Sequence, residues 1–392
     1  MPAYNLLLDF HVPPTILETS ENGKVTSNQE MHNVVRSLGL QGPTSAVTFQ
    51  DGGTLAVFHN EDGSHATLRV YPQGLVTLDL QQWVEEGGEP KITGEVLSDV
   101  EQKFKRVLSS KKSKRLPFIK RGLRLDPYIT TTSEHIVEYD FDRVVYEENS
   151  PYQNIKILHS PQYGNLLLLD DDQNLAESDV AYTYAMTGNG REDFTNKDVL
   201  ILGGGDGGIL YHLLQQNPKF VTMLEISFYN MYQMVIDAAT KYLRGICHDC
   251  FDSLSGDNYL VRVEDCVPVL EQYARDGKTF DYVINDLTDI PIAQEPTEDE
   301  CDLPDKILDL SLKVLKNKGK YWTHGANTNN VPQKFEEHLK NLLQPVDFLK
   351  EVIAIPSYHE LYPFYVDEGA FLWALCCESR DPQDTAVSSS YK

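Results

Sequence analysis

The feature that most constrains the fold of this chain is a short apolar run that leads directly into a glycine-rich turn. Residues 199–202 are Val-Leu-Ile-Leu, and residues 203–208 are Gly-Gly-Gly-Asp-Gly-Gly. A continuous apolar run is typical of a buried parallel strand, and glycines permit a tight turn that brings backbone N–H groups close to a ligand. The sequence therefore predicts a strand, a ligand-binding turn and a helix, in this order.

An aspartate inside the turn restricts the kind of ligand. Asp206 would repel a phosphate group or the carboxylate of a free amino acid, whereas it would attract an amine. Gly203, Gly205 and Gly208 also match the G-x-G-x-x-G spacing, so the turn alone leaves NAD, FAD and S-adenosyl nucleotides open. The aspartate and the single-nucleotide size of the unit favour an S-adenosyl ligand with a cationic tail.

Composition narrows the function classes. The chain has 392 residues, enough for two or three domains, and a net charge of −25. This charge argues against a nucleic-acid partner and suits a cationic substrate, although an acidic surface also serves solubility alone. No apolar run is long enough to span a bilayer, and residues 1–13 lack the features of a secretory signal. The six cysteines form no disulfide or zinc pattern, so we expect a cytoplasmic protein with free thiols and no metal site.

The first 115 residues are predicted to form an α+β domain. Its expected elements are a strand at residues 5–10, a hairpin at residues 66–71 and 75–80, and a helix at residues 100–108. The basic stretch 109–115 is interpreted as a solvated linker that closes this domain.

Two further domains and a tail are predicted after the linker. Residues 116–180 are expected to form a small antiparallel β domain, with strands at residues 136–139, 144–146, 154–158 and 166–169. Residues 181–377 alternate strands with helices, which predicts a doubly wound, Rossmann-like α/β domain. Its expected parallel strands are residues 199–202, 221–224, 261–263, 282–284 and 320–323, with an antiparallel edge pair at residues 352–355 and 371–375. Residues 378–392 are polar and expected to be disordered.

Four acidic residues fall at or just beyond the carboxyl ends of the predicted parallel strands, where ligands bind in such a sheet. They are Asp206, Glu225, Asp265 and Asp286. Glu225 stands where an acidic side chain commonly binds ribose hydroxyls, and Asp265 could hold an adenine amino group. A single aspartate at such a place often only caps a helix, but four around one crevice favour a binding site.

Specific segments then give the chain a resemblance to the polyamine aminopropyltransferases, and among them to the spermine synthases. These segments are Ser-Pro-Tyr-Gln-Asn-Ile at 150–155, Asn-Leu-Ala-Glu-Ser-Asp at 174–179, the glycine turn, Asn-Asp-Leu-Thr at 285–288 and Pro-Ser-Tyr at 356–358. The resemblance covers nearly the whole chain from residue 128 to residue 365, and the long first domain fits the spermine synthases better than the shorter spermidine synthases. It implies an enzyme that transfers the aminopropyl group of decarboxylated S-adenosylmethionine to spermidine, with no cofactor. It also implies a homodimer formed through a first domain that resembles an S-adenosylmethionine decarboxylase fold.

The resemblance assigns roles to individual residues. The adenosine part of the donor is expected to contact the glycine turn, at Gly203 and Gly205, and the side chains of Gln153, Glu225, Asp265 and Cys266. The polyamine is expected to contact Tyr182, Asp206, Tyr358 and Glu360, and Asp286 is the expected proton acceptor. Each residue also has an ordinary structural explanation: a tyrosine is often half-buried in a core, and a cysteine is often a small buried apolar residue.

The chain departs from the family pattern at two places, and alternatives remain open. After Glu225 and Ile226, the stretch 227–233 resembles an insertion of a few residues and lacks the expected aspartate. Tyr184 stands where spermine synthases often have arginine. The alternative functions are spermidine or thermospermine synthesis, S-adenosylmethionine-dependent methyl transfer, and a nucleotide-binding scaffold without catalysis.

Overall fold

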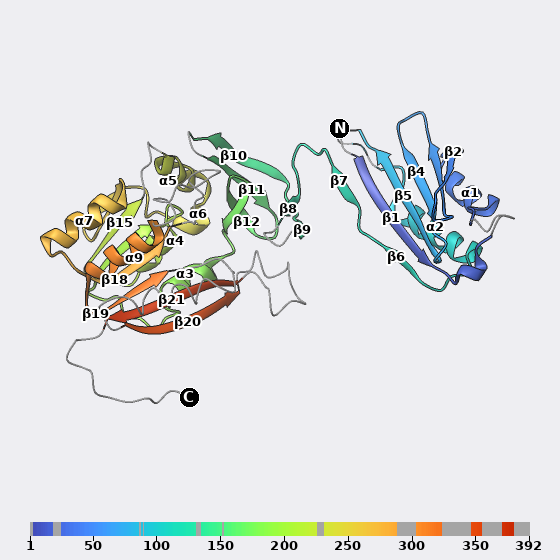
Figure 1. Ribbon diagram of the computed structural model, residues 1–392. Helices are drawn as coiled ribbons and strands as arrows, with labels where there is room; N and C mark the ends of the chain where they lie inside the picture. Colours follow the sequence, from blue (N-terminus) through green and yellow to red (C-terminus); the bar gives the residue numbers. More distant parts are fainter. Residues whose placement is uncertain are drawn as a thin grey trace. The chain divides into compact units, whose positions relative to one another are not determined.

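The chain divides into two compact units, Met1–Asp126 and Pro127–Lys392 (Figure 1). The computed structural model describes residues 3–18, 25–85, 88, 90–130, 135–150, 153–225, 231–287, 303–323, 346–354 and 371–379. For residues 231–233, 303–305, 346–354 and 371–379, it describes the backbone only. Within these residues, no helix is both long and apolar enough to cross a membrane.

The first unit is an antiparallel sheet with its two α-helices packed on one face. The strands are β1 (Ala3–His11), β2 (Gln41–Thr48), β3 (Thr54–His59), β4 (His65–Val70), β5 (Leu75–Trp83), β6 (Ser113–Arg115) and β7 (Ile119–Arg121). They are arranged in the order β2-β3-β4-β5-β1-β6, with β7 also paired to β1. The helices are α1 (Gln29–Arg36) and α2 (Gly94–Val107), and a 3-10 turn, η1 (Pro14–Ile16), follows β1.

Buried and exposed side chains alternate along the strands, which explains why the helices cover one face of the sheet. On β1, Leu6, Leu8 and Phe10 are buried while the residues between them are half-exposed, as expected for a strand with one face in a core. Phe10 stacks on Phe104 of α2, with the ring centroids 5.2 Å apart. The predicted strand and hairpin are confirmed, because β4 and β5 pair in antiparallel register. The predicted helix is also present, and it begins earlier than the sequence indicated.

The basic stretch is not the linker that the sequence predicted. Residues 113–115 form β6, which pairs with Leu8, Asp9 and Phe10 of β1, and β7 pairs with the beginning of the same strand. The backbone hydrogen bonds of the extended chain satisfy polar groups that a solvated linker would leave to water. The stretch therefore lies inside the first unit, whose boundary falls at Asp126.

The second unit begins with two small antiparallel sheets. The strands β8 (Tyr128–Thr130) and β9 (Ile136–Glu138) form a pair, and β10 (Arg143–Asn149), β11 (Asn154–Ser160), β12 (Gly164–Leu169) and β13 (Asp172–Ala176) form a four-stranded sheet in sequence order. The predicted antiparallel sheet is confirmed, and β13 is a strand that the sequence reasoning missed. Ile155, Ile157 and Leu167 bury their side chains in the same core as the following α/β part.

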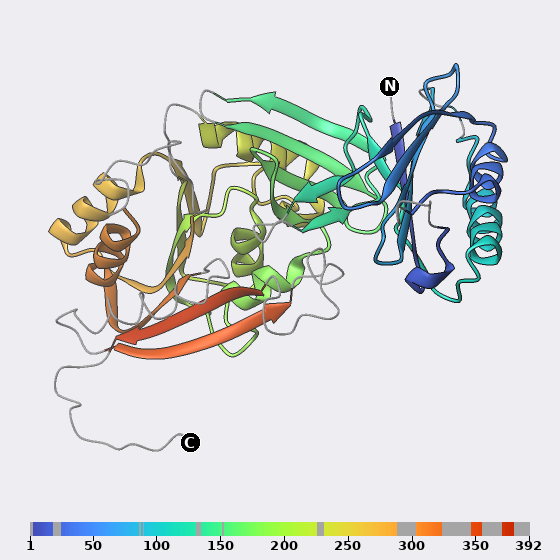
Figure 2. The same ribbon diagram turned by 45° about the vertical axis from the view of Figure 1, so that its right-hand side comes forward.

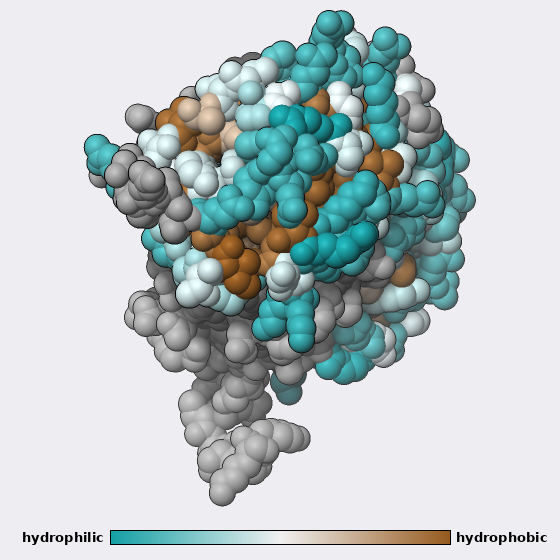
Figure 3. Space-filling view, turned by 90° about the vertical axis from the view of Figure 1, so that its right-hand side faces the viewer, coloured by the Kyte–Doolittle hydropathy of each residue, from teal (hydrophilic) through white to brown (hydrophobic). Residues whose placement is uncertain are grey.

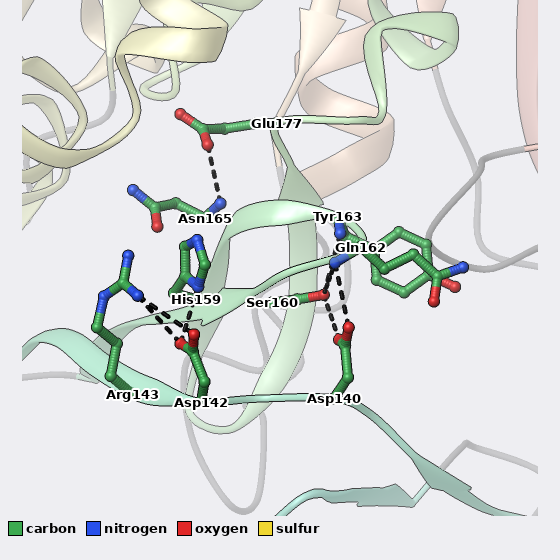
Figure 4. A network of polar contacts seen from close by, with 9 residues as sticks. All are labelled: Asp140, Asp142, Arg143, His159, Ser160, Gln162, Tyr163, Asn165 and Glu177. Carbon is green, nitrogen blue, oxygen red and sulfur yellow. Dashed lines mark hydrogen bonds and ion pairs between the residues drawn. The ribbon is translucent and has the colours of Figure 1, made fainter.

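Polar contacts hold the ends of this small sheet (Figure 4). The Asp140 carboxylate accepts hydrogen bonds from the Ser160 hydroxyl and from the Gln162 backbone N–H, the latter at 3.1 Å. At the other side, the Glu177 carboxylate accepts from Asn165 N–H at 2.9 Å and from Gly245 N–H at 3.0 Å. Glu177 thereby connects the small sheet to α6 of the α/β part, the helix Arg244–Cys247.

The α/β part contains an eight-stranded sheet in the order β16-β17-β15-β14-β18-β19-β21-β20. The strands are β14 (Asp198–Gly203), β15 (Phe220–Glu225), β16 (Ser255–Gly256), β17 (Tyr259–Val263), β18 (Phe280–Asp286), β19 (Leu315–Thr323), β20 (Val346–Ala354) and β21 (Phe371–Ser379). The other helices are α3 (Val180–Met186), α4 (Gly208–Leu214), α5 (Met231–Tyr242), α7 (Cys266–Asp276) and α9 (Leu303–Lys313). Figure 2 shows α7 and α9 on one face of the sheet and α3, α4, α5 and α6 on the other.

This arrangement confirms the predicted doubly wound α/β class. The strands β17, β15, β14, β18 and β19 run parallel, and β21 and β20 add the predicted antiparallel edge pair. From β14, the chain builds outward first to β15 and β17 and then to β18 and β19, so the order reverses between β14 and β18. The predicted tail begins too early, because Glu378 and Ser379 still pair within β21. Residues 380–392 lie outside the described part of the chain.

Candidate active site

The glycine turn lies where the strand order of the parallel sheet reverses, the usual ligand site in such a fold. Gly203 at the end of β14 is in register with Asp286 at the end of β18. Glu225 ends β15, the strand on the other side of β14. The fold therefore gathers the carboxyl ends of three neighbouring strands around one turn.

Glycine is required in this turn for two different reasons. Gly203 has a φ of +80°, and a Cβ on it would lie 2.4 Å from the Asp286 carbonyl oxygen. Gly205 has ordinary backbone geometry, but a Cβ there would lie 3.4 Å from the Glu225 carboxyl group. The first glycine permits the backbone to pass β18, and the second keeps the space in front of Glu225 free of a side chain.

Three carboxyl groups lie around this turn and raise one another's pKa. Glu225 is 2% exposed and Asp286 9% exposed, and no described lysine or arginine forms an ion pair with Asp206, Glu225 or Asp286. Burial raises the pKa of the Glu225 carboxyl well above its usual range, and the charges of Asp286 and Asp206 raise it further. Burial and Asp206 likewise raise the pKa of Asp286. These carboxyl groups thus disfavour one another's ionised forms, and a positively charged ligand would reduce this repulsion.

Hydrogen bonds orient two of these carboxyl groups. The Tyr182 hydroxyl, on α3, donates to Oδ1 of Asp286, and this bond partly opposes the rise in the pKa of Asp286. Asp206 Oδ1 accepts from the Gly208 backbone N–H at 2.7 Å, at the first turn of α4. Burial raises the pKa of Asp206, whereas this N–H lowers it. The side chains of Tyr182 and Asp206 are therefore fixed before any ligand enters.

Two buried polar atoms near the ends of these elements have no hydrogen-bond partner among the described residues. They are Oε2 of Glu225 and Nε2 of Gln153, whose side chain is 8% exposed. Gln153 precedes β11, where its backbone is fixed by hydrogen bonds with the Ser150 hydroxyl. An unpartnered buried acceptor and donor are costly unless a ligand satisfies them.

The predicted adenine contacts Asp265 and Cys266 lie at the beginning of α7. Asp265 caps this helix, because its Oδ1 accepts from Val267 N–H at 2.9 Å, so the alternative capping role is present. Cys266 is fully buried as a free thiol, and burial raises its pKa to about 12, which argues against a nucleophilic role. Cys247 and Cys250 are also free and buried.

The structure thus brings together six of the predicted residues at the glycine turn, and two others lie outside the described part of the chain. The gathered residues are Tyr182, Gly203, Gly205, Asp206, Glu225 and Asp286. Tyr358, Glu360 and residues 226–230 of the predicted insertion lie outside the described residues, whereas Met231, Tyr232 and Gln233 belong to α5. No group of three or more metal-binding side chains occurs in the described part of the chain.

Sequence reasoning did not single out Asn285 as a supporting residue. Its amide donates to the hydroxyl of Tyr321 at 2.9 Å and to that of Thr323 at 3.3 Å, both on the neighbouring β19. These bonds fix the backbone immediately before Asp286. The sequence did offer a signal, because an asparagine near the end of a mostly apolar strand needs hydrogen-bond partners once it is partly buried.

Comparison with known protein families identifies both units. Residues 180–370 match the family described as Spermine/spermidine synthase domain, and residues 128–177 match the Spermidine synthase tetramerisation domain. Residues 29–122 match the family described as S-adenosylmethionine decarboxylase N-terminal. A polyamine aminopropyltransferase of Pyrobaculum aerophilum is 34% identical over 219 residues, which cover 54% of this chain and 70% of that protein.

The chain belongs to the polyamine aminopropyltransferase family. It is an enzyme of the aminopropyl-transferring class. Another family member, from Pyrobaculum calidifontis, is 32% identical over 246 residues, covering 56% of this chain and 79% of that protein. The spermine synthase SPE4 of Saccharomyces cerevisiae is 31% identical over 153 residues, 38% of this chain and 48% of that protein. A solved spermidine synthase in complex with the transition state analogue AdoDATO shares the fold, with a TM-score of 0.50, 22% identity and coverage of 65% of this chain and 80% of that one.

Proposed function

We propose that this aminopropyltransferase is a spermine synthase, which transfers the aminopropyl group of decarboxylated S-adenosylmethionine to spermidine. The observation that carries the proposal is the gathering of Asp206, Glu225 and Asp286 around one glycine turn without a protein cation among the described residues. Both proposed substrates are cations, one a sulfonium with an amine tail and the other a polyamine. Their positive charge would offset the mutual repulsion of the three carboxylates.

The reaction needs a deprotonated amine, and Asp286 is the proposed proton acceptor. A primary amine with a pKa of about 10, like that of lysine, is protonated at neutral pH and cannot attack. A carboxylate in hydrogen-bond reach removes this proton as attack proceeds. The nitrogen then forms a bond to the aminopropyl carbon next to sulfur, the carbon–sulfur bond breaks in line, and its electron pair leaves on methylthioadenosine. The proton ends on Asp286.

The other residues divide the binding between the two substrates. Oε2 of Glu225 and Nε2 of Gln153 offer an acceptor and a donor for the adenosine part, because both atoms are buried and have no hydrogen-bond partner in the described part of the chain. Asp206 is proposed to hold an ammonium group that stays charged, and Tyr182 to hold Asp286 in position. Tyr358 and Glu360 remain proposed polyamine contacts from the sequence. No cofactor or metal takes part in this proposal.

The first unit supports the choice of spermine over spermidine as the product. Its match to the S-adenosylmethionine decarboxylase N-terminal family extends the chain well beyond the synthase domain. We further propose a homodimer formed through this unit, whose large apolar side chains Ile16, Val47, Phe49 and Val96 are more than a third exposed. Figure 3, which faces the α1 and β2 side of the unit, shows apolar residues between hydrophilic ones at the surface. The buried free thiols favour the cytoplasm.

The decisive experiment incubates the purified protein with decarboxylated S-adenosylmethionine and either putrescine or spermidine, followed by separation of the polyamines. We expect spermine from spermidine and little product from putrescine. Spermidine from putrescine would retain the mechanism and make the protein a spermidine synthase, and a thermospermine product would be separated from spermine by the same chromatography. No product from a folded protein would support the scaffold without catalysis.

A further inference from the structure

A cavity of about 140 Å³ lies between α3, α4, α6 and the end of β13. Its lining includes Val180, Thr183 and Tyr184 of α3 and Gly208 and Tyr211 of α4. Asp286, Glu225 and Tyr182 do not line it. The cavity is smaller than the 300–1,000 Å³ of typical drug-sized sites, so it has room for one small group or one end of a longer molecule.

Four aromatic rings form much of its wall. Tyr184 and His212 meet edge to face with centroids 5.0 Å apart, and Tyr211 stacks on His248 at 4.0 Å. Burial lowers the pKa of His212, which favours the neutral imidazole over the charged form that would repel a cation. The π faces of neutral aromatic rings attract ammonium groups.

Two carboxylates complete the cavity, and no lysine or arginine lines it in the described residues. Asp179, 1% exposed, has Oδ2 bonded to the Ala176 N–H at 2.8 Å. Glu177 accepts from the backbone N–H groups of Asn165 and Gly245, the first of which is drawn in Figure 4. These bonds hold both carboxylates at the wall of the cavity, where their negative charges favour a cation over an anion.

The same hydrogen bonds argue against an anion. An anion at the beginning of a helix needs free backbone N–H groups. The Gly208 N–H already donates to Asp206 at 2.7 Å, and the Gly245 N–H already donates to Glu177 at 3.0 Å. Two formal negative charges also exceed the partial positive charge of a helix end, about half an elementary charge.

We propose that this cavity is a second binding site, separate from the catalytic centre, for the terminal alkylammonium group of an organic amine. The aromatic rings take up the alkylammonium group, and Glu177 and Asp179 supply the opposite charge. That the natural ligand is a polyamine rests on the proposed function. Because Gly208 donates to Asp206 and Thr183 follows Tyr182 in α3, an amine bound here lies directly behind the catalytic centre.

The test uses n-butylammonium as the probe and sodium butyrate as its counterpart with the opposite charge. The readout is the ring proton signals of His212 and His248 in histidine-labelled, full-length protein, assigned by single His→Gln substitutions. We expect butylammonium to shift both signals saturably and butyrate to leave them unchanged. Equal shifts with butyrate, or no saturable shift with butylammonium, would overturn the proposal. The readout needs no turnover, so an inactive protein with this response would refute only the proposed function.

Two pairs of variants separate binding from a structural effect. Val180 is 53% exposed, so both charged variants should fold. Val180→Lys should weaken butylammonium binding, and Val180→Glu should tighten it, each roughly 2- to 10-fold by the Coulomb interaction near a surface. Tyr184, 46% exposed, should lose about 2- to 30-fold in affinity as Tyr184→Leu and little as Tyr184→Phe, which retains the ring. Equal affinities within each pair would contradict the proposed cation site.

Discussion

Gln82 in the first unit differs from Glu225 and Gln153 in the second unit in how its buried polar atoms are satisfied. In the first unit, Gln82 is 2% exposed, and its amide both donates to the Ile92 carbonyl and accepts from the Ile92 N–H, each at 2.9 Å. In the second unit, Glu225 is also 2% exposed and Gln153 is 8% exposed, yet each has a buried atom that no described residue partners. Burial with partners stabilises a fold, whereas burial without partners leaves binding capacity for a ligand.

The largest expected effect separates two acids with raised pKa values, Asp286 in the second unit and Asp79 in the first. Asp286→Asn should lower kcat by about 10²- to 10⁴-fold, because the amide cannot accept the proton from the attacking amine. The control is Asp79→Asn in the first unit, whose carboxyl also has a pKa raised by burial and by Asp9. This variant should leave kcat unchanged. Steady-state kinetics with circular dichroism of both proteins checks the comparison, and an Asp286→Asn enzyme of normal kcat would remove Asp286 from the mechanism.

The same substitution at two buried glutamines tests the comparison itself. Gln82→Leu should destabilise the first unit by about 2–3 kcal/mol, because both polar groups of Ile92 lose their partner. Gln153→Leu should change stability little, since Nε2 forms no hydrogen bond with the described residues, but should raise KM for the nucleotide. Calorimetric unfolding and initial rates measure the two effects. A stability loss at Gln153 as large as that at Gln82 would indicate that Gln153 has a structural role.

A smaller effect is expected on the choice of donor. S-adenosylmethionine carries a carboxylate that Asp206 would repel, whereas its decarboxylated form does not. Asp206→Asn should therefore lower the inhibition constant of S-adenosylmethionine, by roughly tenfold, relative to that of a decarboxylated analogue. Competitive inhibition assays provide the measurement. An unchanged ratio of the two constants would show that Asp206 does not discriminate between them.

The smallest effect concerns the pH dependence of stability. The pKa of Glu225 is raised in the folded protein, so its favourable contribution is complete below the unfolded pKa of about 4.3 and is lost as pH rises through the folded pKa. Glu225→Gln removes this titration and should flatten the decline in stability between pH 5 and 8 by on the order of 1 kcal/mol. Some decline in stability should remain in this variant, because the pKa values of Asp206 and Asp286 are also raised in the folded protein. Thermal unfolding across this range is the measurement, and two parallel curves would contradict the prediction.

The sequence predicted the parallel sheet well because buried parallel strands are continuous apolar runs. Placing Glu225 and Asp286 at strand ends followed from the same pattern, and the fold does bring them to the glycine turn. The strand β13 is mostly polar and has no continuous apolar run. The residues of β6 are mostly basic, so the sequence favoured a solvated linker over a strand paired with β1. The partner of β6 is about 100 residues earlier in the chain, whereas β13 forms a hairpin with the adjacent β12.

The details of the site depended on tertiary contacts that no spacing rule gives. The Tyr182 hydroxyl meets Asp286 across 104 residues of sequence, and the Asn285 amide depends on two hydroxyls of a neighbouring strand. That Oε2 of Glu225 has no hydrogen-bond partner among the described residues follows only from the three-dimensional positions of its neighbours. The sequence indicated which acidic residues gather at the glycine turn, and the structure added how their side chains are held.

The bridge formed by Glu177 has a consequence for how this sequence can diverge. A Cβ on Gly164 or on Gly245 would lie 2.6 Å from a Glu177 carboxylate oxygen. The three positions lie on different segments, but a substitution at one affects the others. A larger residue at either glycine would displace the Glu177 carboxylate, which accepts hydrogen bonds from the backbone N–H groups of Asn165 and Gly245. Among descendants of this chain, we expect Gly164, Glu177 and Gly245 to be retained or replaced together, while the loops around them vary independently.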